Sequence, residues 1–330
     1  MTNKANMIGT VLQILAFASL LLGPAPGAIA QTYPAKTIHL LVPFPAGGPA
    51  DLLSRVVAKK LSDGLGEQVV VENRPGAGGT IAMEAVSKSP PDGYTLALGS
   101  NSTFAIAPIL YRKLRYDPFK SFAPITLIAR SSSVILVSTS VPAASLQELI
   151  ALAKSSPGKL NFGSNGNGTI PHLAGMLFQS LTGVSFVHIP YKGAAQVTTD
   201  LIAGQIQVGF IVSSGLEQYI RDGKLKAVAV ASSKRLPQLP EVPTAAEAGL
   251  PGFETYTWFG LAAPQGTPQD VIQRLNAETL KSLAAKETNN VLVKQGFEPE
   301  GTTPEQFSRF IAAEAEKWAP VIKASGMRLD

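Results

Sequence analysis

Cysteine is absent from all 330 residues. Without thiols the chain can form no disulfide framework and no thiolate metal site, so its stability must come from a buried core. A lipid anchor attached just after a secretion signal would also need a cysteine, and the mature chain is therefore expected to be free in its compartment. The 45% apolar composition is typical of a globular protein.

Long apolar runs are also missing, except at the N-terminus. Residues 1–30 combine Lys4, an apolar stretch over 7–23 and the small residues of Ala28-Ile29-Ala30. This order predicts a cleaved secretory signal and a soluble, periplasmic mature chain that begins near Gln31. A membrane anchor is the alternative, but the stretch is shorter than the roughly 20 residues that a spanning helix needs. The remaining length is typical of two domains.

The sequence has neither a block of like charge nor a catalytic motif. Its net charge of +5 comes from scattered basic residues, so we expect no nucleic acid partner. The three histidines form no HExxH zinc helix, and there is no GxSxG nucleophile elbow and no Walker A loop. We therefore expect no metal site, no cofactor and no catalysis. His39 and His188 fall inside strand patterns and are expected in the core.

Short apolar runs alternate with helical patterns along the chain. This alternation predicts α/β units with largely parallel sheets. Strands are expected at 38–42, 69–71, 95–98, 134–137, 160–162, 186–189, 207–212 and 227–231. Helices are expected near 50–63, 80–88, 145–154, 171–182, 194–203, 215–222, 268–285 and 304–318.

A glycine-rich turn over residues 43–51 follows the first strand and opens a helix with Pro49 in its first turn. Glycine lets the backbone reach positive φ, and the start of a helix supplies free N–H groups and the positive end of a dipole. Such a turn suits a carboxylate or a phosphate. The alternative is an ordinary turn in which Asp51 complements the helix dipole.

A second turn, residues 163–172, has the same layout, with Thr169 as a candidate N-cap ahead of Pro171. Two such turns predict two lobes that each present a helix N-terminus to one cleft. A hydrolase that uses Ser164 and His172 as nucleophile and base is an alternative, but no third residue is apparent to orient the base.

Two further stretches could line the same cleft. Gly99 to Thr103 ends a strand, and residues 190–193 precede a helix that carries Asp200. Tyr191 offers an apolar wall and a hydroxyl, and Asp200 could bind a ligand amine or hold a water. The alternative for Asp200 is a position on a solvated helix surface.

Ten segments of the chain match one family in order and spacing. They are VPFPAGGPADLLSR (42–55), VENRPGAGGTIAMEAV (71–86), PDGYTLALGS (91–100), FAPITLIAR (122–130), GSNGNGTIPHLAGMLF (163–178), VHIPYKGAAQ (187–196), DLIAGQIQVGF (200–210), GKLKAVAVAS (223–232), LPEVPTAAEAGLPGFE (239–254) and WFGLAAPQGTP (258–268). This set resembles the extracytoplasmic solute receptors of tripartite tricarboxylate transporters, the Bug-type periplasmic binding proteins. The resemblance covers essentially the whole mature chain.

The resemblance implies a type II periplasmic binding protein, an α/β fold whose two lobes are joined by two crossing segments with the ligand cleft between them. Lobe 1 would comprise residues 31–129 plus 255–330, and lobe 2 residues 130–254. In such receptors the two glycine-rich turns hold one ligand carboxylate. By position, the ligand-binding residues would be Phe44, Ala46, Gly47, Ser100, Asn101, Ser164, Asn165, Gly168 and Thr169, with Tyr191 and Asp200 at the far end of the cleft.

The implied function is that of a monomeric receptor that closes around a small carboxylate and delivers it to the permease subunits of a membrane transporter, without a cofactor. A receptor that signals by docking on a sensor kinase would have the same sequence features. The resemblance leaves the carboxylate unidentified, because the far end of the cleft varies among these receptors.

Overall fold

The structure is a computed structural model that describes residues 33–324 and 326–329. Residues 1–35 and residues 36–330 are separate units, and the second unit holds every element described below. The predicted signal peptide and its cleavage point near Gln31 lie outside the described residues. Within residues 33–324 and 326–329, every helix is too short or too polar to span a bilayer.

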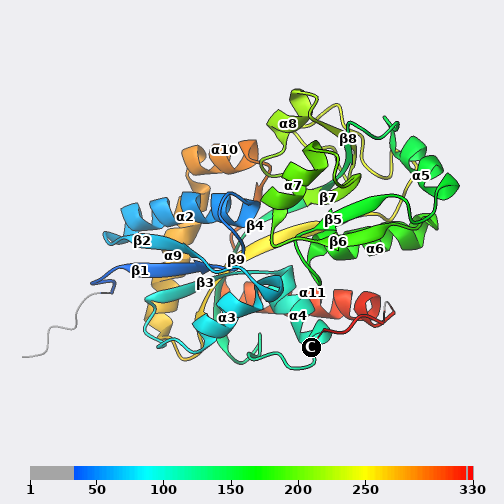
Figure 1. Cartoon of the computed structure of the whole chain (residues 1–330). Helices are drawn as coiled ribbons and strands as arrows, with labels where there is room; N and C mark the ends of the chain where they lie inside the picture. The colour runs from blue at the N-terminus through cyan, green and yellow to red at the C-terminus, as the bar shows by residue number, and fades with distance from the viewer. Residues whose placement is uncertain (1–32, 325, 330) are drawn as a thin grey trace, which may run out of the picture. The chain divides into compact units, whose positions relative to one another are not determined.

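A mixed sheet lies at the centre of the 36–330 unit, and helices cover its faces (Figure 1). The described residues contribute ten strands in the order β2-β1-β3-β9-β4-β7-β5-β6, and β8 and β10 also pair with β4. The strands are β1 (Ile38–Val42), β2 (Val69–Asn73), β3 (Thr95–Ser100), β4 (Phe122–Ser138), β5 (Asn161–Ser164), β6 (Val187–Pro190), β7 (Val208–Val212), β8 (Leu225–Val230), β9 (Tyr256–Pro264) and β10 (Glu298–Pro299).

The predicted helices all form, with ends that shift by a few residues. The helices are α2 (Pro49–Leu65), α3 (Thr80–Ser87), α4 (Ala107–Leu110), α5 (Leu146–Ser155), α6 (Ile170–Thr182), α7 (Ala194–Ile202), α8 (Glu217–Arg221), α9 (Gln269–Ala284), α10 (Lys286–Lys294) and α11 (Pro304–Ala324). The short α4 and α10 were not predicted. A wide π-helical turn over Asn101–Ile106 leads into α4.

The long strand β4 divides the sheet into two sections. Its first part, residues 122–132, pairs with β9 in the section that contains β1, β2 and β3. Its second part, residues 133–138, pairs with β7 and β8 in the section that contains β5 and β6.

The expectation of largely parallel strands is only half right. Strand β1 runs parallel to β2 and β3, and β5 runs parallel to β6 and β7. Every pairing of β4 and β9 is antiparallel. The helix-linked strands follow the parallel βαβ rule, whereas β4 runs through both sections and β9 lies between β3 and β4, antiparallel to both.

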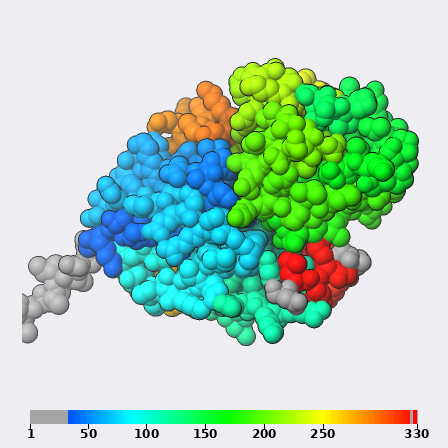
Figure 2. Space-filling model, in the orientation of Figure 1, coloured from blue at the N-terminus to red at the C-terminus, as the bar shows by residue number. Residues whose placement is uncertain are grey.

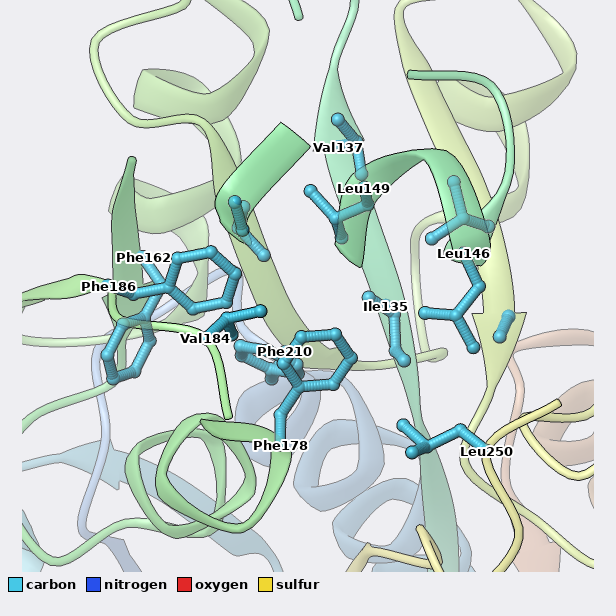
Figure 3. Close-up of a cluster of buried hydrophobic side chains, with 14 of the residues drawn as sticks. Ile135, Val137, Leu146, Leu149, Phe162, Phe178, Val184, Phe186, Phe210 and Leu250 are labelled. Atoms are coloured by element: carbon cyan, nitrogen blue, oxygen red, sulfur yellow. The ribbon is translucent and has the colours of Figure 1, made fainter. Parts of the chain in front are cut away.

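Separate apolar cores stabilise the two sections. Figure 3 shows Phe162, Phe178 and Phe210 packed together behind the second section, where β5, β7 and α6 supply the rings. In the first section, Trp258 packs against Phe104 with ring centroids 6.3 Å apart. Each fully buried ring of this kind contributes about 1.5–3 kcal/mol. These cores fix the strand ends from which the glycine-rich turns project.

A third apolar cluster connects the sections through α6. Leu173 of α6 packs with Leu110 of α4 and with Trp318 of α11. In Figure 2 the C-terminal residues, in red, lie directly against the green surface. The N-terminal end of α6 is therefore held between both sections of the sheet.

Candidate ligand-binding site

A small cavity lies where three helices begin. Helices α2, α6 and α7 each contribute first-turn residues to its wall. The cavity measures about 30 Å³, which is room for roughly two waters. Its wall consists of Phe44, Pro45, Gly48, Pro49, Ala50, Ser102, Asn165, Thr169, Ile170, Pro171, Ala194, Ala195, Val212, Thr257 and Phe259. None of these described residues has a charged side chain.

The three helix starts give this neutral cavity properties that suit an anion. The amides of Ala50, Ile170 and Ala194 lie in the first turn, where they have no acceptor within their own helix. Each helix adds a partial positive charge at its N-terminus, which stabilises an anion by about 0.3–1 kcal/mol. A carboxylate placed there would be bound by backbone donors and dipoles instead of a cationic side chain.

The turn between β1 and α2 is held by an ion pair whose acidic partner, Asp51, is buried and whose basic partner, Arg55, is exposed. The carboxylate of Asp51, which is 3% exposed, accepts the Gly47 N–H at 3.0 Å and the Arg55 Nε–H at 3.0 Å. The Asn73 amide donates to the Phe44 carbonyl at 3.0 Å. Burial by itself would raise the pKa of Asp51, but the hydrogen bonds from Arg55 and Gly47 outweigh it and lower the pKa.

The turn between β5 and α6 is closed by hydroxyl groups. Thr169 is the N-cap of α6, as predicted, but its hydroxyl makes no capping bond. Instead it donates to the Gly166 carbonyl at 2.7 Å, and Thr169 is 1% exposed. Ser164 is fully buried and also donates to Gly166, at 3.2 Å. These bonds fold the turn back on itself.

The structure does not form the Ser164–His172 pair that a hydrolase would need. The Ser164 Oγ lies 2.7 Å from Nε2 of His188, whereas Nδ1 of His172 accepts the Gly168 N–H at 3.2 Å. This bond gives His172 a hydrogen-bonding role within the turn. The prediction for His39 was wrong: it is half-exposed and pairs with Glu72 at 2.6 Å, because β1 turns this side chain away from the core.

In the turn after β3, Ser102 lines the cavity, whereas the Asn101 side chain makes hydrogen bonds that stabilise the surrounding structure. The Asn101 side chain is fully buried, accepts the Trp258 N–H at 2.9 Å and donates to Glu314 at 3.2 Å. Ser100 is also fully buried, and its backbone N–H donates to the Thr103 hydroxyl at 3.0 Å. Glu314 of α11 thereby anchors the π-helical turn that positions Ser102.

A second cavity, of about 340 Å³, adjoins the first. Phe44 and Asn165 line both cavities, and Tyr191 and Lys192 line only the second. The Tyr191 hydroxyl donates to Asp200 at 2.7 Å. Burial, together with this carboxylate, raises the pKa of Tyr191 to about 12. Asp200 itself faces a separate surface hollow and lines neither cavity.

The predicted site residues therefore fall into three groups: residues that line one of the two cavities, residues that lie next to lining residues in the sequence, and Asp200, which lies apart from both cavities. Phe44, Asn165 and Thr169 line the small cavity, and Tyr191 lines the adjoining one. Ala46, Gly47, Ser100, Asn101, Ser164 and Gly168 lie within two positions of lining residues but are not part of the wall, and Asp200 lies outside both cavities.

The start of α7 is one part of the site that was not predicted from the sequence, and Val212, Thr257 and Phe259 are the others. Ala194 and Ala195 line the cavity beside the two predicted turns. The signal was present, because Gly193 follows a strand and precedes a helix, as in the other two turns. Gly193 also permits a close approach: a Cβ built there would lie 2.8 Å from Pro45. Figure 2 shows blue and green surfaces in contact on this face of the molecule.

Comparisons with known proteins identify the family. Residues 53–327 match the model of the tripartite tricarboxylate transporter family receptor. The protein BugT of Bordetella pertussis (strain Tohama I) is 38% identical over 308 residues, which are 93% of this chain and 94% of BugT.

Two solved structures have the same fold. The R. palustris protein Rpa4515, solved with adipate, is 36% identical with a TM-score of 0.87, covering 90% of this chain and 99% of that one. The periplasmic binding protein BugD is 36% identical with a TM-score of 0.86, at the same coverage. The periplasmic binding protein fold is thereby confirmed, and the chain belongs to the tripartite tricarboxylate transporter receptor family.

Proposed function

We propose that this chain is a periplasmic receptor that closes two lobes around a small carboxylate and delivers it to the permease subunits of a tripartite transporter. Lobe 1 comprises residues 31–129 plus 255–330, and lobe 2 comprises residues 130–254. The observation that carries the proposal is the neutral cavity at the starts of α2, α6 and α7. The adipate in Rpa4515 supports a carboxylate as the ligand class.

Closure follows from the origin of the three helices. In this division α2 belongs to lobe 1, whereas α6 and α7 belong to lobe 2. A carboxylate that bridges them gains charge-assisted hydrogen bonds from both lobes only when the lobes are together. The ligand therefore binds the closed state better and shifts the population toward it. A permease that recognises the closed form would then receive loaded receptor selectively.

The remaining parts of the proposal concern the cell. The N-terminal signal directs the chain to the periplasm, and the mature receptor acts there as a monomer without a cofactor. The family's transporter supplies the permease partner. Catalysis is not part of the proposed function, since Ser164, which a hydrolase would use, is buried behind the turn.

Isothermal titration calorimetry with a panel of small carboxylates, adipate included, tests the proposal. We expect saturable one-to-one binding, recovery of the ligand unchanged, and a smaller radius of gyration in X-ray scattering when ligand is bound. Turnover of a panel member would contradict the receptor function. A complete lack of carboxylate binding would contradict the ligand class.

A further inference from the structure

Two histidines behind the β5–α6 turn form a stacked pair. His172 lies in the first turn of α6 and His188 lies on β6. Their ring centroids are 3.9 Å apart and the rings are within 8° of parallel. Phe162 of β5 stacks on His188 at 4.7 Å. The pair therefore has a fixed position beneath the turn, set by one helix and two strands.

Each imidazole is bonded to one end of the turn. Nδ1 of His172 lies 3.2 Å from the Gly168 backbone nitrogen. Because a backbone N–H can only donate, this Nδ1 must be unprotonated, and the proton of the neutral ring is on Nε2. Nε2 of His188 contacts the Ser164 hydroxyl at 2.7 Å, and Ser164 in turn holds Gly166.

The segment between these two hydrogen-bonded positions, Ser164 and Gly168, lies beside the cavity. Asn165 and Thr169 line the cavity and lie between or beside the bonded positions. The turn has little conformational freedom at Gly168, because its φ is +74° and a Cβ built there would lie 2.1 Å from Leu110 Cδ2. A change in how the imidazoles hold Ser164 and Gly168 is therefore transmitted to the cavity wall.

We propose that His172 and His188 are positioning residues for the carboxylate-binding turn 164–169, and that protonation of the pair releases the turn and the ligand. The proposal rests on the proposed carboxylate-binding function. Protonation of His172 would put a proton on Nδ1 and break the bond from Gly168. Protonation of either ring would also place a positive charge against the face of the other.

The surroundings of the pair favour the neutral form. Burial lowers the pKa of His172 to about 4, and the neighbouring His188 adds to this effect. Burial likewise lowers the pKa of His188 to about 4. The described groups that face the rings, which are Phe162, Ser164 and Gly168, carry no charge, so the two imidazoles are the titratable groups in this contact. The turn is thus formed at neutral pH and released in acid.

Two substitutions of His172 distinguish the role of its hydrogen-bond acceptor from the role of its stacked ring. His172→Phe keeps an aromatic ring but offers no acceptor to Gly168, whereas His172→Asn places Oδ1 near the former Nδ1 and cannot be protonated in this range. His39→Asn is the matched control, because His39 is bonded to Glu72 on a different strand.

The first readout is hydrogen exchange of the Gly168 amide, which needs no ligand. We expect exchange about tenfold faster in His172→Phe than in wild type, the loss of a bond worth roughly 1.4 kcal/mol. His172→Asn should restore most of the protection, and His39→Asn should leave it unchanged. Unchanged protection in His172→Phe would overturn the positioning role. If His172→Phe does not fold, loss of protection in wild type below pH 5 is the deciding measurement, and retained protection at pH 4 overturns the proposal.

The second readout is adipate affinity between pH 7 and about pH 3.5, below the pKa of both rings, in wild type and in the double variant His172→Asn/His188→Gln. Titration of adipate itself affects both proteins equally, so the difference reports the imidazoles. We expect wild-type affinity to fall at least threefold more than that of the double variant. Equal losses would overturn the release mechanism. If exchange behaves as expected but no panel carboxylate binds wild type, the positioning of the turn stands and the proposed ligand class fails.

Discussion

The two glycine-rich turns that border the cavity are held in place by different chemistry, a charged pair of side chains in one turn and a neutral pair in the other. The β1–α2 turn is held by the charged pair of Asp51 and Arg55, whereas the β5–α6 turn is held by the neutral pair of His172 and His188. Both are strand-to-helix turns with residues in the cavity wall. The groups behind each turn therefore hold its conformation as much as its own sequence does, and these groups set the sensitivity of the turn to acid.

The largest effect is expected from Gly47→Val in the first turn. Gly47 has φ +79° and an ideal Cβ there meets nothing within 4 Å, so the protein has room for the side chain but its backbone is strained. We expect carboxylate affinity to fall by at least about a hundredfold, since displacement of this turn would remove roughly two charge-assisted hydrogen bonds that the first-turn amides of α2 offer the ligand.

Gly252→Val is the matched control for that variant. Gly252 has φ +80° and equally open surroundings, but it lies outside the turns that border the cavity. The two variants should lose similar stability in urea unfolding, and only Gly47→Val should lose binding. Wild-type affinity in Gly47→Val would refute the assignment of the first turn to the site.

Asp51→Asn should produce the next largest effect, on stability. The amide has no charge to pair with Arg55, and it would place an NH2 donor against the Arg55 Nη2, which lies 3.0 Å from the second Asp51 oxygen. We therefore expect the free energy of unfolding to fall by about 1–3 kcal/mol. Asp63→Asn on the same helix removes an exposed ion pair with Lys59, which should cost less than about 1 kcal/mol. Equal costs would show that the first turn does not depend on its ion pair.

Acid should release the two turns in a fixed order. The folded-state pKa of each histidine is about 4, below the ordinary 6.5, so the unfolded chain binds more protons between these values and stability falls as pH drops from 6.5 to 4. The folded pKa of Asp51 is below its ordinary 3.8, so its contribution is present above 3.8 and is lost only at lower pH. Protection of the Gly47 amide at pH 4 should therefore outlast that of Gly168, and the reverse order would contradict the account.

Thr169→Val tests the second turn by removing one hydroxyl. We expect every panel carboxylate to bind about tenfold more weakly, because the Thr169 hydroxyl fastens Gly166 beside the cavity. Thr279→Val is the control: its hydroxyl is also fully buried and also donates to a backbone carbonyl at 2.7 Å, in α9. A comparable loss of affinity in Thr279→Val would mean that the effect is on stability only.

The smallest effect is expected from Asp200→Ala. Asp200 touches Tyr191 and not the cavity, so it acts on the ligand only through the tyrosine. Calorimetry should show less than about a threefold change for any carboxylate, which is below one ordinary hydrogen bond. A tenfold change in the order of preference would instead place Asp200 in direct contact with the ligand.

The sequence predicted the elements that local patterns determine. Periodicity located the helices, and glycine and proline located the turns at Gly47 and Thr169. The sequence also indicated a family whose fold is now confirmed. The direction of β4 and β9 could not be predicted, because it is determined by pairing between residues that are far apart in the chain.

Long-range contacts also explain what was missed in the site. Asn101 has a polar side chain that would suit a ligand-binding residue, but its amide donates a hydrogen bond to Glu314, which lies 213 positions later in the chain. His188 resembles a core residue in a strand, but its ring lies on His172 and its nitrogen on Ser164. A single sequence does not contain these pairings, because they arise only when α11 and β6 have packed.

The central claim is that helix N-termini, and not cationic side chains, bind a carboxylate in this cavity. The most direct test is calorimetric titration with the panel carboxylate that binds most tightly and with its primary amide, which has nearly the same shape and no charge. The account predicts one-to-one binding of the acid at pH 7 and at least about a hundredfold weaker binding of the amide, since hydrogen bonds to a charged group contribute about 1.5–3 kcal/mol. Equal affinity for acid and amide would contradict it.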